Sequence, residues 1–141
     1  MRALFMILAM LGSGCARLHT VEDCELLIHV VNPELSAIAE LNHAGKHPAG
    51  FYGKIADRYD KLAGRVAKVA VRSQQLAVGQ QQFKEVLELV ARHARDFDAG
   101  LGEKRDKQRE LNLRRARKGM SSAARQYVAA VKRLDAICHP R

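Results

Sequence analysis

The sequence predicts an all-α protein, folded as an antiparallel up-down-up-down four-helix bundle. Apolar residues recur at heptad spacing in four stretches, and the links between the stretches are short, some of them marked by Gly or Pro. No stretch alternates between apolar and polar residues as a half-buried strand would. Three long helices, with the first stretch left unpacked, are the alternative arrangement.

The first helix is expected to begin at Thr20, because residues 20–23 (TVED) have the spacing of a capping box. Pro33 interrupts this helix, since a proline ring clashes with the carbonyl group four residues earlier. The apolar stripe keeps its phase across the proline, which predicts a kink or a short break rather than a new direction. The members of this stripe are Cys24, Ile28, Val31, Leu35 and Ile38.

The other three helices follow from three further apolar stripes. The second stripe covers residues 52–69, the third covers residues 76–97 after the good N-cap Ser73, and the fourth covers residues 113–138. We expect the four stripes to cover one another and so to form the core. The large apolar members of the fourth stripe are Leu113, Met120, Tyr127, Val131 and Leu134.

A disulfide between Cys24 and Cys138 is expected from the same topology. The first helix starts and the fourth helix ends at the same end of an up-down-up-down bundle, and both cysteines occupy core-facing positions there. Two cysteines with no other expected role favour a disulfide if the protein is exported, and the N-terminal sequence described next predicts export. The bond would contribute about 4 to 5 kcal/mol by the chain-entropy argument. Two separate buried thiols are the alternative.

The N-terminus has the pattern of a secretory signal. Arg2 provides a positive charge, and the apolar run of residues 3–11 follows it. Nine apolar residues cannot span a membrane as a helix, because the hydrocarbon core requires roughly 20. The small residues 12–14 (GSG) then end at Cys15.

The stretch from Leu11 to Cys15 resembles the lipobox of bacterial lipoproteins. This resemblance implies that the thiol of Cys15 receives a diacylglyceryl group and that cleavage before Cys15 makes it the acylated first residue. Two or three acyl chains are sufficient for stable attachment to a membrane. Ala16 in place of an aspartate favours the periplasmic face of the outer membrane of a Gram-negative bacterium. A plain signal peptide, with Cys15 as an ordinary thiol, is the alternative.

These features divide the chain into a cleaved signal peptide (residues 1–14), a lipid-anchored linker (15–19) and a helical bundle domain (20–141). Removing residues 1–14 from the 141-residue chain leaves 127 residues, enough for one domain with a sizeable core. The removed part holds one arginine and no acid, so the net charge changes from +9 to +8. The spacing of Tyr52, Tyr59 and the terminal cysteine is faintly similar to that of small uncharacterised helical lipoproteins.

Positive charge is densest in residues 103–119, which contain eight basic and three acidic side chains. Such a run is typical of a solvated helix face, and it could also bind an anionic envelope polymer such as peptidoglycan or lipopolysaccharide. Arg115 precedes Cys138 by 23 residues, about 35 Å of helix, so the run should point away from the anchoring membrane. Nucleic acid is not expected as a partner of an exported protein. The candidate contact residues are Lys104, Arg105, Arg109, Arg114, Arg115, Arg117 and Lys118.

The sequence contains no convincing catalytic constellation, and we expect neither an enzyme nor a cofactor. His43 and His47 are four residues apart, but Gly45 and Pro48 indicate a turn rather than a metal-binding helix face. Residues 135–139 (DAICH) resemble the haem attachment motif of c-prime cytochromes, with an aspartate where the first cysteine should stand. The predicted function is a non-enzymatic binding or scaffolding module anchored by lipid, and a haem or metal carrier is the minor alternative.

Overall fold

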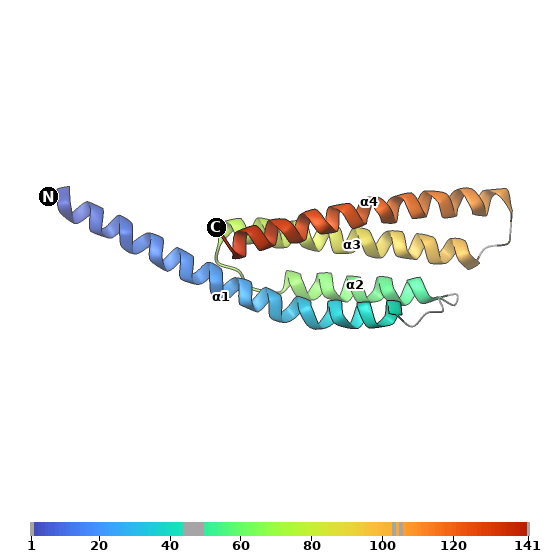
Figure 1. Cartoon of the computed structure of the whole chain (residues 1–141), viewed down its shortest axis with the longest axis horizontal. Coiled ribbons are helices and arrows are strands. Elements are labelled where there is room, and N and C mark those ends of the chain that lie inside the picture. Colours follow the sequence, from blue (N-terminus) through green and yellow to red (C-terminus); the bar gives the residue numbers. More distant parts are fainter. Residues whose placement is uncertain (1, 44–49, 103, 105, 141) are drawn as a thin grey trace.

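The computed structural model describes residues 2–43, 50–102, 104 and 106–140, with the side chains of residues 2–18 and 42–43 left undescribed. These residues form four helices and no strand. The helices are α1 (Arg2–His43), α2 (Phe51–Ala67), α3 (Gln74–Gly102) and α4 (Lys107–Cys138). They run alternately up and down, as Figure 1 shows, and this confirms the predicted antiparallel four-helix bundle.

Helix α1 differs from the prediction at its start, because it begins at Arg2 and not at Thr20. No proline and no glycine lies between Cys15 and Thr20, so nothing in the sequence stops the helix before the supposed cap. The predicted linker is therefore helical as well. The helix also stays continuous through Pro33, and Figure 1 shows α1 bending where it joins the bundle.

Helix α2 begins with a cap supplied by another helix. Gly50 precedes it with a φ of 84°, a left-handed conformation that favours glycine. The Asp98 carboxylate on α3 accepts hydrogen bonds from the backbone N–H groups of Gly50 and Tyr52, each at 3.1 Å. A negative charge at this place also suits the positive end of the helix dipole. Asp98 thus ties the start of α2 to the last part of α3.

Helices α3 and α4 begin with local caps. The hydroxyl group of Ser73 accepts a hydrogen bond from the backbone N–H of Leu76 at 3.3 Å, as predicted for this N-cap. The Asp106 carboxylate accepts a hydrogen bond from the backbone N–H of Arg109 at 2.7 Å. Both helices therefore start where a short oxygen-bearing side chain can satisfy an otherwise unpaired amide.

Helices α3 and α4 pack closely through small residues. A Cβ atom added to Gly79 would lie 3.0 Å from the side chain of Leu134, and one added to Gly100 would lie 2.9 Å from the side chain of Leu113. Small residues allow helix backbones to approach each other closely, and α4 supplies them at intervals of seven. The buried residues of α4 are Ala116, Ala123 and Ala130.

The prediction that the four apolar stripes cover one another is wrong for the stripe on α4. Its large apolar side chains are only partly buried or exposed, and Val131 is 40% exposed. Helix α4 turns its alanine face toward α3, and of its larger apolar side chains Tyr127, Val131 and Leu134 line the cleft between α4 and α1. On α1 the core position is taken by Leu27, which is 4% exposed, and not by Ile28, which is 43% exposed. Helix α1 packs mainly on α2 and touches α4 much less.

A buried carboxylate, Asp23, fixes α1 to the link between α2 and α3. Its oxygen atoms accept hydrogen bonds from the backbone N–H of Arg72 at 2.6 Å and from the Arg72 guanidinium at 3.0 and 3.1 Å. The backbone N–H of Ser73 donates a further bond at 3.4 Å. Burial alone would raise the pKa of Asp23, but these hydrogen bonds and the guanidinium charge outweigh burial and hold the pKa below its ordinary value.

A second buried carboxylate, Glu34, fixes α1 to α2. It is 6% exposed and forms ion pairs with Arg58, Lys61 and Arg65 on the facing side of α2. Burial again would raise its pKa, and the hydrogen bond from Arg65 and the three positive charges lower it below the ordinary value. Because the cations are partly exposed, the pairs orient α1 more than they stabilise it.

The substitution Asp23→Asn tests the link between α1 and the α2–α3 connection. We expect the free energy of unfolding at pH 7 to fall by roughly 1–3 kcal/mol, because charge-assisted hydrogen bonds are lost. The depressed pKa of Asp23 contributes stability that is present above its unfolded pKa and is lost as the pH falls through its folded pKa. The difference between D23N and the parent protein should therefore shrink on acidification, measured by urea unfolding at several pH values. The exposed Asp57→Asn is the control and should change little.

The substitution Ala123→Leu tests the close contact between α3 and α4. Ala123 is fully buried, so the larger side chain must push the helices apart, at a cost of roughly 1–3 kcal/mol. Ala129→Leu, at an exposed position on the same helix, is the matched control. Thermal unfolding of both variants measures the effect, and equal melting temperatures would contradict this account of the interface.

Candidate functional site

The disulfide between Cys24 and Cys138 joins the middle of α1 to the end of α4. The sulfur atoms are 2.00 Å apart and the Cα atoms 5.7 Å apart, which confirms the predicted pair. The closed loop has a sequence separation of 114 residues. Cys24 is 3% exposed and belongs to the core. The bond therefore marks the end of the bundle at which α1 and α4 come together.

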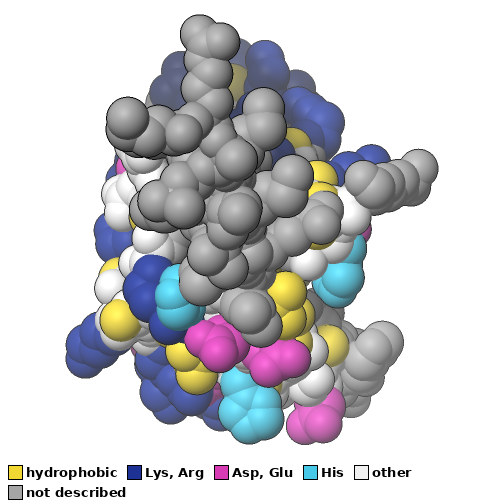
Figure 2. Space-filling view, turned by 90° about the vertical axis from the view of Figure 1, so that its left-hand side faces the viewer, with side chains coloured by type: hydrophobic (Ala, Val, Ile, Leu, Met, Phe, Trp, Pro, Cys, Tyr) yellow, Lys and Arg dark blue, Asp and Glu magenta, His cyan; other side chains and the backbone are white. Residues whose placement is uncertain are grey.

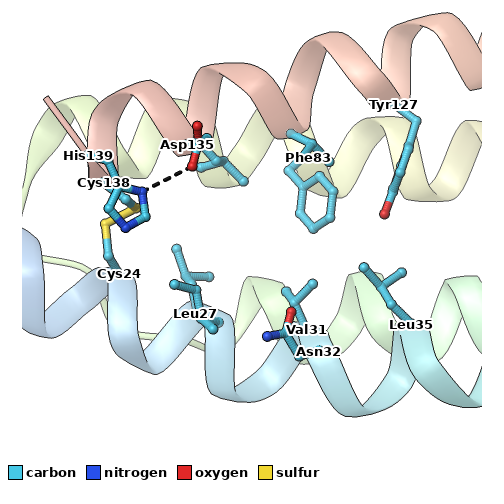
Figure 3. Close-up of a pocket in the computed structure, with 13 residues that line it drawn as sticks. Cys24, Leu27, Val31, Asn32, Leu35, Phe83, Tyr127, Asp135, Cys138 and His139 are labelled. Carbon is cyan, nitrogen blue, oxygen red and sulfur yellow. Dashed lines mark hydrogen bonds and ion pairs between the residues drawn. A yellow bond between two sulfur atoms is a disulfide. The ribbon is translucent and has the colours of Figure 1, made fainter. Parts of the chain in front are cut away.

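Beyond the disulfide a cleft opens between α1 and α4, here called the α1–α4 groove, with a volume of about 320 Å³. Figure 3 shows side chains from α1 and α4 facing each other across it, with Phe83 of α3 between them and the disulfide at one end. The lining is mostly apolar. Helix α1 contributes Leu27, Ile28, Val31 and Leu35, and helix α4 contributes Tyr127, Val131 and Leu134.

A second hollow of about 300 Å³ adjoins the groove at Tyr127, which lines both. It lies among α2, α3 and α4 and is also lined by Tyr59 and Met120. Burial raises the pKa of Tyr59, and burial together with the neighbouring Tyr59 raises that of Tyr127. Both phenols are therefore neutral at physiological pH, and the two hollows hold no buried carboxylate or ammonium group among the residues that line them.

Polar side chains gather near the closed end of the groove. The Nδ1 atom of His139 lies 3.0 Å from the Oδ1 atom of Asp135, and His19 lies 3.7 Å from Glu22 on α1. Figure 2 looks at this end of the molecule and shows histidine and acidic side chains close to one another on its described part. All four side chains are largely exposed, so these contacts add little to stability.

Those of the predicted basic residues that the structure describes lie toward the opposite end of the bundle, near the connection between α3 and α4 (Figure 1). Arg109 donates hydrogen bonds to the carbonyl oxygens of Gly100 and Leu101, at 2.9 and 3.2 Å, and so caps the end of α3. Arg114 pairs with Glu110 one turn earlier. These two arginines therefore have structural partners.

The remaining basic residues that the structure describes differ in their surroundings. The Arg117 guanidinium lies 5.7 Å from the centre of the Phe97 ring, close enough for a cation–π contact. Lys104, Arg115 and Lys118 are exposed, and Arg105 lies outside the described residues. Exposed side chains of this kind fit both a solvated helix face and a surface for an anionic polymer.

The described residues offer little for a metal or haem site. Where side chains are described, no three His, Cys, Asp or Glu lie together as metal ligands. The side chain of His43 and all of His47 lie outside the described part. Cys138 is bonded to Cys24, so a thioether at Cys138 would require the disulfide to be absent.

The side chain of Cys15, the predicted lipidation site, also lies outside the described part of the chain, and the structure places only its backbone, in α1. None of the described helices is long and apolar enough to cross a membrane. Comparison with protein-family models, with curated proteins and with solved structures gives no match.

The sequence alone did not point to the groove. Heptad spacing identified Tyr127, Val131 and Leu134 as apolar, but it could not show which side of α4 packs on α3. The recurrence of alanine at 116, 123 and 130 was the available signal, because residues this small favour the closest helix contact.

Replacing Cys138 by serine tests how far the bundle depends on the disulfide. We expect the free energy of unfolding to fall by about 4 to 5 kcal/mol, because a loop this long is no longer closed in the unfolded chain. Amide hydrogen exchange should rise most in α1 and in the last turns of α4. The matched control is Cys15→Ala, which removes the cysteine that is not part of the disulfide. A similar loss of stability in that variant would contradict the conclusion that the Cys24–Cys138 bond stabilises the bundle.

Proposed function

We propose that this protein is a lipid-anchored protein of the bacterial cell envelope that acts as a non-enzymatic binding or scaffolding module. The observation that carries the proposal is the N-terminal sequence, in which an apolar run and three small residues end at Cys15. A bundle closed by a disulfide is consistent with a location in the cell envelope, since disulfides persist in oxidising environments outside the cytoplasm.

The positions of the cysteines support an arrangement of the bundle relative to the membrane. Cys15 precedes Cys24 by nine residues, about 14 Å of helix. The proposed anchor would therefore hold the disulfide end of the bundle near the lipid surface, on the periplasmic face of the outer membrane. The connection between α3 and α4 would point away from that surface, into the space where envelope proteins could bind.

The intact mass of the native protein, taken from the membrane fraction, tests the lipid anchor and the disulfide together. We expect the mass of residues 15–141 plus a diacylglyceryl group, with or without a third acyl chain, and a rise of two hydrogen atoms after reduction. A mass without lipid would refute the lipid anchor, and two free thiols before reduction would refute the disulfide. The substitution Cys15→Ala should move the protein from the detergent-rich phase to the aqueous phase in a phase-separation experiment. The control Cys24→Ala should leave the protein in the detergent-rich phase.

A further inference from the structure

We propose that a row of basic side chains on α2 binds an acidic amphipathic helix of a partner protein. The row is here called the α2 basic stripe, and its members are Lys54, Arg58, Lys61, Arg65 and Lys68. This inference rests on the binding role proposed above and names the class of partner, but it does not depend on the lipid anchor. The spacing, the charge and the surroundings of the stripe support it.

The stripe follows one face of α2. Its members are separated by four, three, four and three residues, which is the spacing of neighbours along a single helix face. Lys68, the C-cap residue, follows Lys54 by 14 residues, so the row is about 21 Å long and carries a positive charge about every 5 Å. A second helix with carboxylates at the same spacing has the same rise per turn. It could therefore meet the whole row in register.

The stripe carries more positive charge than its surroundings neutralise. Its three middle members share a single carboxylate, that of Glu34 on α1. Lys54 and Lys68 are exposed, and neither forms an ion pair with a described side chain. Five positive charges therefore face one negative charge, which leaves a net charge of +4 along the row. A partner of opposite charge would be attracted and oriented by it.

Glu34 also holds the middle of the stripe in place. Its side chain is buried, and its carboxylate accepts hydrogen bonds from the guanidinium groups of Arg58 and Arg65. Each guanidinium group donates one N–H to Glu34 and has others for a second carboxylate. Side chains that are already held in a row lose less conformational entropy when a partner binds. The stripe is thus arranged for carboxylates before any partner arrives.

An apolar edge on α1 adjoins the stripe. Figure 1 shows α1 and α2 running side by side, and Glu34 marks the place where α1 meets the stripe. Val30 and Ala37 are neighbours of Glu34 by helical spacing, and Leu26 is the neighbour of Val30. Leu26 is 53% exposed and the other two are partly exposed. An amphipathic helix could cover this edge with apolar side chains while its acidic side chains meet the stripe.

The surroundings of the stripe disfavour a flat or a purely polar partner. Asp57 and Asp60 lie on the side of α2 that faces α3, where both pair with Arg95. An anionic membrane pressed against the stripe would bring its head groups toward these partly exposed carboxylates. A polymer without apolar groups would leave Leu26 in water. A helix lying over the seam between α1 and α2 avoids both costs.

The test uses a fluorescent synthetic peptide, long enough to form a helix, with glutamates at the spacing of the stripe and leucines along an adjacent edge. Fluorescence anisotropy measures its binding to the Cys15→Ala chain in aqueous buffer, so that neither lipid nor detergent competes for the peptide. We expect saturable binding. A scrambled peptide of the same composition, with no acidic face, should bind at least about tenfold more weakly. Equal binding of the two peptides would overturn the proposal, because it would show attraction to any acidic chain.

Charge reversal assigns the binding to the stripe. The double variant K54E/K68E changes the two lysines without ion pairs, so the bundle should stay folded while the affinity falls at least about tenfold. K118E/K132E, at two exposed positions on α4, is the matched control and should bind normally. Helix content by circular dichroism and the mass of the intact disulfide verify that each variant is folded. If K54E/K68E binds the peptide like the parent chain, the assigned surface is wrong.

The substitution Leu26→Gln tests the apolar edge. We expect the affinity for the peptide to fall by about fivefold, because the apolar contact with the leucines of the peptide is lost. Leu111→Gln, at a position on α4 that is 45% exposed, is the matched control and should bind normally. Unchanged binding by L26Q would show that charge alone attracts the peptide, and it would overturn the proposed amphipathic partner.

Two other partners would also overturn the proposal. Inorganic polyphosphate that displaces the peptide more strongly than unlabelled peptide does, at equal charge, would show an anionic polymer as the partner. Binding to phosphatidylglycerol vesicles that is lost in K54E/K68E would show a membrane. The lipid anchor is tested separately: a chain whose native mass includes lipid but which does not bind the peptide would refute this inference and leave the anchor intact.

Discussion

The arrangement of the bundle depends on the covalent bond between Cys24 and Cys138. Helix α1 packs much more on α2 than on α4, to which this bond joins it. The preceding residue, Asp23, binds the link between α2 and α3 through the backbone and side chain of Arg72. Two consecutive residues of α1 therefore fix it at this end of the bundle. Cys24 joins it covalently to the end of α4, and the buried charge of Asp23 holds it to the link between α2 and α3.

The open seam between α1 and α4 follows from the way in which α3 packs. Helix α3 lies between α2 and α4 and contacts both through small residues, so these helices approach closely. The alanine face of α4 is used for this contact together with Leu113 and Leu134, whereas Val131 lines the seam and stays exposed. An apolar cleft is thus the consequence of good packing elsewhere in the bundle, and not of a poorly formed core.

Much of the fold could be predicted from the sequence, because heptad spacing and helix caps such as Ser73 are local signals. The disulfide followed from topology, since only an even number of antiparallel helices brings Cys24 and Cys138 to the same end. The predicted start of α1 at Thr20 was wrong, because a capping box marks the start of a helix only where the residues before it are not helical. The burial of Asp23 could not be predicted, because its partner Arg72 lies 49 residues away in the sequence. The groove could not be predicted either, because heptad spacing does not show how far α4 rotates about its axis.

The course of α1 has a mechanical consequence. The helix passes without interruption from its N-terminal segment through Cys24 into the bundle, as Figure 1 shows. A pulling force applied to that segment would reach Asp23 and Cys24 before it reached the contacts of α1 with α2. The disulfide would then carry the load directly into the end of α4, so α1 could not peel away from its neighbours turn by turn while the bond is intact. The bundle should therefore resist tension along α1 as a single unit.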